Sequence, residues 1–199
     1  MRIILASASP RRKELLTRMG LTDFSVVTSD ADETLQDGLS PAEQVERLSL
    51  LKARSAAKLV PEDALIIAAD TVVTLNSAIL GKPSDENDAF SMLSALSGSR
   101  HQVYTGVTVL HQGKNLTCHE MTSVDFRPLS SEEIRHYIAT KECMDKAGAY
   151  GIQGYGCLLV EGIVGDYYNV MGLPVVRLAR MLGEFGIDCL KYAAKEYQP

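Results

Sequence analysis

The apolar segment between residues 64 and 75 restricts the possible folds of this chain more than any other part of the sequence. It contains two aliphatic stretches, residues 64–69 and 71–75, with a single carboxylate, Asp70, between them. Each stretch has the length of a strand and is far too short to cross a membrane. The segment therefore predicts a buried strand and its continuation, with Asp70 at the end or bend of the first part.

Strong helix-start signals flank this segment. The residues from Ser40 to Glu43 form a capping box with proline at the first helical position, and those from Ser130 to Glu133 form a second capping box. With the apolar periodicity, these signals predict an interleaved series of helices and strands, the later strands antiparallel. The fold class is therefore α/β, with a mixed central sheet flanked by helices in one domain over residues 1–199. The predicted helices cover residues 11–19, 41–60, 84–98, 131–140 and 174–186, and the other strands cover 2–6, 24–28, 102–110, 116–126 and 157–163.

Charge and cysteine content argue against several classes of protein. Twenty Lys and Arg against 25 Asp and Glu give a net charge of −5, which disfavours a nucleic-acid or anionic-membrane partner. The segment formed by residues 1–5 is too short for a secretory signal peptide and runs straight into a turn. The cysteines are too widely spaced for a structural zinc site, so we expect free thiols in a reducing cytosol. They are Cys118, Cys143, Cys157 and Cys189.

Two charged residues lie where the local pattern calls for apolar ones. Asp70 interrupts the buried strand, and Lys52 falls within the apolar stripe of the helix predicted after Ser40, four residues from both Leu48 and Ala56. A buried carboxylate loses hydration unless it is paired, hydrogen-bonded or bound to a metal. Asp70 is either a turn-capping residue or a carboxylate at a cleft. Lys52 either extends its ammonium into solvent or faces an anionic pocket.

Further cations follow structural transitions in the chain. Ser9, Arg11 and Arg12 lie where the first predicted strand gives way to a helix, an arrangement that favours phosphate oxygens. Lys82 lies in a loop that Pro83 stiffens, about a dozen residues after Asp70. A solvated basic surface is the alternative for each of these residues. Their combination predicts a pocket for a phosphorylated ligand.

An acidic loop and a glycine-rich segment complete the candidate site. The loop after the second strand holds Asp30, Asp32 and Glu33, which are either solvated or face phosphates across Mg²⁺ or Mn²⁺. Residues 148–156 contain four glycines, a density that permits tight turns and close backbone approach. Within them, Gln153 offers both a donor and an acceptor for the edge of a base.

Several of these segments together resemble the Maf family of nucleotide pyrophosphatases. The resemblance covers essentially the whole chain, and residues 147–154 resemble the branch that acts on dTTP and UTP. It implies a mixed α/β fold with two lobes and a cleft, like that of inosine triphosphatases, and a metal-dependent cytoplasmic enzyme, often a homodimer. The matching segments are Leu5 to Arg12, Lys52-Ala53-Arg54, Ala68-Ala69-Asp70-Thr71, Gly81-Lys82-Pro83, Asp145 to Gly154 and Gly172-Leu173-Pro174.

The resemblance implies a role for each candidate residue. Asp70 resembles the catalytic carboxylate, which activates water with a divalent metal, Mg²⁺ or Mn²⁺. Glu33 resembles an acidic residue near that metal, a place that Asp30 or Asp32 could also take. The phosphate contacts would be Ser9, Arg11, Lys52 and Lys82, and the selectivity positions would be Arg12, Thr71 and Gln153.

The implied reaction is hydrolysis of dTTP, UTP or modified pyrimidine analogues to the monophosphate and pyrophosphate. Two alternatives stay open. One is a related pyrophosphatase with another base preference, such as 7-methyl-GTP. The other is a nucleotide-binding regulator of cell division that does not turn its ligand over. A nucleic-acid-binding module is disfavoured by the negative net charge and by the shortness of the basic cluster around Arg11.

Overall fold

The computed structural model describes residues 1–28 and 30–196 of the chain. It divides into two compact units. The first comprises Met1–Asp70, Thr105–Glu120 and Gly172–Pro199, and the second comprises Thr71–Tyr104 and Met121–Met171. Three long strands, β3 (Leu65–Leu75), β5 (Arg100–His111) and β6 (Lys114–Phe126), contribute residues to both units.

The strands form a mixed sheet in the order β2-β1-β3-β5-β6-β7, with β4 paired to β3. β1 (Ile3–Leu5) runs parallel to both β2 (Phe24–Val26) and β3. β4 (Ala78–Leu80) is antiparallel to β3, and β7 (Val160–Val164) is antiparallel to β6. The mixed α/β fold predicted from the sequence is confirmed.

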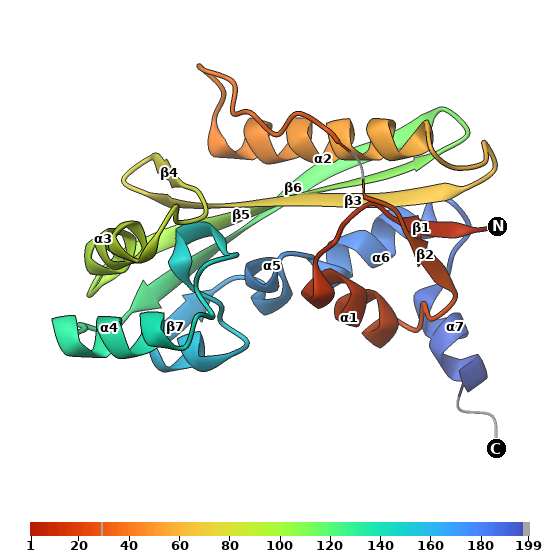
Figure 1. Cartoon of the computed structure of the whole chain (residues 1–199). Helices are drawn as coiled ribbons and strands as arrows, with labels where there is room; N and C mark the ends of the chain where they lie inside the picture. Colours follow the sequence, from red (N-terminus) through yellow and green to blue (C-terminus); the bar gives the residue numbers. More distant parts are fainter. Residues whose placement is uncertain (29, 197–199) are drawn as a thin grey trace. The chain divides into compact units, whose positions relative to one another are not determined.

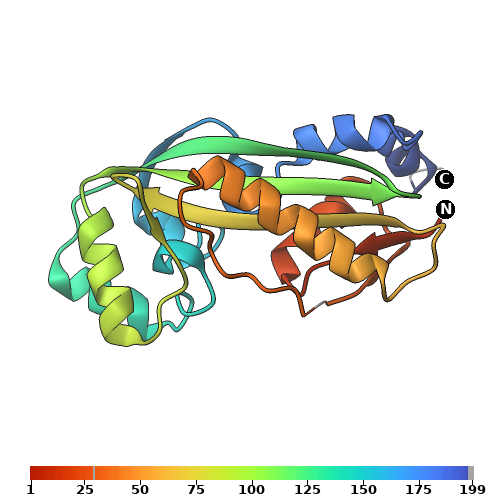
Figure 2. The ribbon, with the colours of Figure 1, turned by 90° about the horizontal axis from the view of Figure 1, so that it is seen from above.

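In the first unit, helices cover both faces of the sheet (Figures 1 and 2). α2 (Pro41–Ala57) lies on one face, and α1 (Pro10–Arg18) and α6 (Val175–Gly183) lie on the other. The contact with α2 is made by small side chains: Ala53 and Ala56 pack against Ile4, Ile66 and Ala68. Burial of such apolar surface stabilises the unit by roughly 25 cal/mol per Å².

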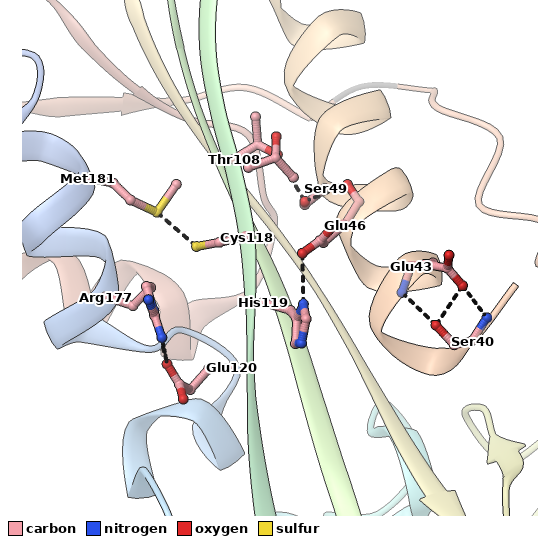
Figure 3. A network of polar contacts seen from close by, with 11 residues as sticks. Ser40, Glu43, Glu46, Ser49, Thr108, Cys118, His119, Glu120, Arg177 and Met181 are labelled. Carbon is pink, nitrogen blue, oxygen red and sulfur yellow. Dashed lines mark hydrogen bonds and ion pairs between the residues drawn. The ribbon is translucent and has the colours of Figure 1, made fainter.

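Gly106 permits a close approach between β5 and α2. A Cβ at this position would lie 2.1 Å from the backbone oxygen of Val45, so only glycine fits there without a backbone shift. Polar contacts hold the same helix to the sheet (Figure 3). Ser49 Oγ lies 2.9 Å from Thr108 Oγ1, and Glu46 Oε1 lies 2.7 Å from His119 Nδ1.

The second unit packs α3 (Glu86–Leu96) beside α4 (Ser131–Ala139) and contains the short helix α5 (Tyr167–Met171). An aromatic cluster forms part of its core. His101 is fully buried, its Nε2 lies 2.8 Å from the Tyr150 hydroxyl, and its ring packs edge-on against Phe126.

Both predicted capping boxes are present. Ser40 N donates to Glu43 Oε2 at 2.8 Å, while Glu43 N donates to Ser40 Oγ at 3.3 Å, and Ser130 and Glu133 repeat this pattern at the start of α4. A turn joins β3 to β4, with Asn76 and Ser77 at φ 49° and 69°. Such left-handed pairs suit two-residue hairpin turns.

Four expectations were wrong in detail. Asp70 does not end or bend a strand: β3 runs unbroken from Leu65 to Leu75, because residues 73–75 continue it by pairing with β4. The strand expected from residue 157 starts only at Val160, since Tyr155–Leu158 form a 3-10 turn. A further helix, α7 (Cys189–Glu196), follows the helix expected to be last. The helix expected over residues 41–60 ends at Ala57, and Leu59 beyond its end is 63% exposed. Among the described residues, no helix is both long and apolar enough to traverse a bilayer.

Candidate functional site

A lysine between two carboxylates forms the centre of the candidate site in the first unit. Lys52 Nζ lies 2.7 Å from Asp70 Oδ1 and 2.9 Å from Glu33 Oε2. The side chains of Lys52 and Asp70 are 13% and 11% exposed, whereas that of Glu33 is 57% exposed. Lys52 therefore faces a buried carboxylate instead of extending into solvent.

The strand period explains why Asp70 meets this lysine. Ile66 and Ala68 pack against α2, and residues two apart on a strand share a face. Asp70 is next in that series, so its side chain also faces α2. Lys52 precedes Ala53, whose side chain makes the same helix–sheet contact. The pairing thus follows from the helix packing on β3.

Arg12 belongs to the same electrostatic group. Its Nε donates to the Gly172 oxygen at 2.8 Å, and its Nη1 donates to Ser7 Oγ at 3.2 Å, which fixes the guanidinium on the sheet side of α1. Burial lowers the pKa of Arg12, the negative charges of Asp70 and Glu33 raise it, and the positive charge of Arg11 lowers it further. The structure therefore brings Arg12, Lys52 and the two carboxylates together within the first unit, and Arg11 adjoins Arg12 on α1.

Ser9, the remaining candidate of this unit, caps the N-terminus of α1 by position. Its side chain makes no capping hydrogen bond, and its backbone N–H donates to Ser7 Oγ at 3.2 Å. Ser7 was not among the predicted residues, although it receives hydrogen bonds from both Ser9 and Arg12. Its position in the turn before α1 was the signal available in the sequence.

The acidic loop contributes Glu33, and not its neighbour Asp32, to the contact with Lys52. Asp32 instead accepts hydrogen bonds from the backbone N–H and the hydroxyl of Thr34, at 3.0 and 2.5 Å, and these bonds lower the pKa of its carboxyl group. In residues 1–28 and 30–196, no group of three or more His, Cys, Asp or Glu side chains is arranged to hold a metal. Mg²⁺ is nevertheless commonly bound through one or two carboxylates together with substrate phosphates. Because Glu33 and Asp70 converge on one cationic group, they fit such a partial ligand set.

The other candidates belong to the second unit. Thr71 follows Asp70 on β3 and its side chain points to the opposite face. Lys82 is exposed in the loop after β4, and Gln153 is exposed between two 3-10 turns. The backbone N–H of Gly148 donates to the oxygen of Gly81 at 3.0 Å. This bond brings the loop of Lys82 next to the start of the glycine-rich segment that carries Gln153.

Glu142, which was not predicted, organises the glycine-rich segment. Its carboxylate accepts hydrogen bonds from the backbone N–H groups of Tyr155 and Gly156 and from the hydroxyl of Tyr137. A carboxylate six residues before the first glycine of the segment was the available signal, but spacing alone does not show that it folds back onto the glycines.

Similarities to known proteins cover nearly the whole chain. A family model described as Maf-like protein matches residues 2–185. A dTTP/UTP pyrophosphatase of Bacillus cereus (strain B4264) is 50% identical over 187 residues, covering 94% of this chain and 97% of its own length. One of Clostridium novyi (strain NT) is 50% identical over 191 residues, covering 94% of this chain and 100% of its own length. Among solved structures, a HAM1 protein from Coxiella burnetii matches the fold with a TM-score of 0.52 at 17% identity, covering 92% of this chain and 99% of that one.

Proposed function

This chain belongs to the family of Maf-like proteins, and on that premise we propose that it is a pyrophosphatase that hydrolyses dTTP and UTP. The products would be the nucleoside monophosphate and pyrophosphate. The relatives that are 50% identical over 94% of this chain carry that name, which supports the choice of substrate. In this proposal residues 1–199 act as one catalytic domain.

The observation that carries the proposal is the buried carboxylate of Asp70, held by Lys52 and within the field of Arg12. In the proposed mechanism, Asp70 orients the attacking water at the α-phosphorus and accepts its proton. Lys52 holds the carboxylate in place through the 2.7 Å contact. A structural aspartate in a strand would need no such convergence of cations.

The positively charged groups suit a triphosphate. Such a substrate carries about four negative charges at neutral pH, and these must be offset as charge builds on the leaving pyrophosphate. We assign Ser9, Arg11, Lys52 and Lys82 to the phosphates. Glu33 and Asp70 would hold a divalent cation, Mg²⁺ or Mn²⁺, which neutralises phosphate charge when bound.

Base selection is assigned to Arg12, Thr71 and Gln153. The side-chain amide of Gln153 offers one acceptor and two donors, which suits the polar edge of a pyrimidine. A base that leaves such groups unpaired is rejected strongly. The variant Gln153→Ala should therefore narrow the difference in kcat/KM between UTP and other nucleotides more than it lowers kcat. Equal losses for all nucleotides would instead make Gln153 a structural residue.

The decisive experiment is hydrolysis of UTP and dTTP by wild type and Asp70→Asn in the presence of Mg²⁺, with detection of pyrophosphate. We expect the variant to lose about 10²–10⁴-fold in kcat, the usual range for a positioned general base. Asp63→Asn, which removes an exposed carboxylate of the same unit, should keep full activity. Near-wild-type turnover by Asp70→Asn would remove this residue from its role, and binding without products would favour a regulator.

The family resemblance also supports two further parts of the proposal. The enzyme would work in the cytoplasm and as a homodimer. Sedimentation of the purified chain tests the second part, since a monomer at assay concentrations would contradict it.

A further inference from the structure

The loop that carries Gln153 is tethered by a carboxylate outside the site proposed above. We propose that Glu142 is a positioning residue for base selectivity, because it holds the loop from Gly151 to Gly156 in the conformation that presents Gln153. This inference rests on the proposed function, since it assigns a cause to the discrimination between bases. Glu142 and the loop belong to the same unit.

The carboxylate binds the loop through both of its oxygens. Oε2 of Glu142 accepts from the backbone N–H of Tyr155 at 2.8 Å. Oε1 accepts from the N–H of Gly156 at 3.1 Å and from the Tyr137 hydroxyl at 2.9 Å. Hydrogen bonds to a charged acceptor are about twice as strong as neutral ones. The two from Tyr155 and Gly156 therefore fix the C-terminal end of the loop.

Tyr137 anchors the N-terminal end of the same loop, at Gly151. Its hydroxyl donates to Glu142 and accepts from the N–H of Gly151 at 3.1 Å. The side chain is buried at 5% exposure, and this burial raises the pKa of the phenol, so the hydroxyl stays a donor at neutral pH. The two anchored ends flank Gln153 in the sequence.

The glycine at position 154 permits this tether. A Cβ on Gly154 would lie 2.0 Å from Glu142 Oε2, and a Cβ on Gly156 would lie 2.5 Å from the oxygen of Gly151. Side chains at either place would displace the carboxylate or open the loop. The glycines expected to allow close backbone approach thus do so around an acidic side chain.

The tether should matter for selectivity more than for chemistry. Reading a base edge requires donor and acceptor atoms held to within about 0.5 Å. A loop released from Glu142 would let Gln153 adopt several positions, so that different bases would be accepted more equally. The proposed catalytic cluster of Asp70, Lys52 and Glu33 belongs to the other unit and does not depend on these bonds.

The test compares wild type with Glu142→Gln on a panel of dTTP, UTP, CTP and GTP. The amide of Gln keeps the size of the side chain but turns a donor toward the backbone N–H groups. We expect the ratio of kcat/KM for UTP over CTP to fall about tenfold, the effect of losing one hydrogen bond to a charged group. The kcat for UTP should stay within about threefold of wild type. Glu161→Gln, an exposed change in the same unit, should alter neither value.

Two further variants separate positioning from general loss of structure. Tyr137→Phe removes the hydroxyl's bonds to Glu142 and Gly151 but keeps the bonds from the N–H groups of Tyr155 and Gly156 to Glu142, so it should give a smaller loss of selectivity. Gly154→Ala should match Glu142→Gln. Amide hydrogen exchange of residues 151–156 should speed up in each variant while α3 and α4 stay protected. Faster exchange without a change in the UTP to CTP ratio would overturn the inference. If the wild type hydrolyses none of the four nucleotides, the proposed function fails first and this inference fails with it.

Discussion

Replacement of Lys52 by methionine tests the electrostatic balance of the candidate site. Methionine nearly keeps the volume of the lysine stem, so the change removes the ammonium without opening a large cavity. It leaves Asp70, with a side chain only 11% exposed, without its 2.7 Å partner. Glu33 also loses a contact, but its 57% exposed carboxylate regains hydration at little cost.

The expected loss of stability comes almost entirely from Asp70. Removing one partner of a buried ion pair destabilises a protein by about 3–5 kcal/mol. The guanidinium of Arg12 is near enough to Asp70 to offset part of this cost. We therefore expect Lys52→Met to lower the free energy of unfolding by about 3 kcal/mol, the low end of that range. Glu33→Gln should lower it by less than about 1 kcal/mol.

Urea unfolding at neutral pH, followed by far-UV circular dichroism, measures these differences. The same unfolding curve should be obtained by tyrosine fluorescence. This agreement shows a single unfolding transition, which must be checked in a chain with two compact units. The double variant Lys52→Met/Asp70→Asn should recover most of the lost stability, because it removes the unpaired charge as well. The reasoning is refuted if Lys52→Met costs no more than Glu33→Gln, or if the double variant is as unstable as the two single changes together.

Three other predictions concern stability. Burial lowers the pKa of His101 to about 4, so between pH values of about 6.5 and 4 the unfolded state takes up a proton that the folded state does not. The free energy of unfolding should therefore fall by about 3 kcal/mol as the pH drops through this window. In His101→Gln the urea midpoint should change less with pH than in wild type, whereas the exposed His136→Gln should keep the wild-type pH dependence. Gly106→Ala forces a Cβ into a backbone carbonyl of α2 and should lower the free energy of unfolding by about 1–3 kcal/mol or more. Gly183→Ala, with open space around the new Cβ, should be neutral or stabilising. Equal Tm values for the two variants would contradict this reasoning. Ser40→Ala removes the cap of α2 and should cost about 1 kcal/mol in the same assay, and no loss would show that Pro41 alone suffices to start the helix.

Local elements were predictable because their signals act over a few residues. The capping boxes at Ser40 and Ser130 satisfy backbone N–H groups within the same turn, so the residue types alone predict where the helices start. The unbroken course of β3 was not predictable, because it depends on pairing with β4 after Asp70. The tether from Glu142 to the glycine-rich loop was missed for the same reason, since its bonds join residues 13 and 14 positions apart.

The amino-acid sequence alone determined that Asp70 and Lys52 occupy otherwise apolar faces and that cations gather in the first turn of α1. It also indicated the family, through several short segments distributed over the chain. Only the tertiary structure decided that Lys52 lies between Asp70 and Glu33, and that Asp32 turns back to Thr34 instead. The reason is that these contacts depend on how α2 packs across β3 and on the path of the loop after β2, and neither is set by neighbouring residues along the chain.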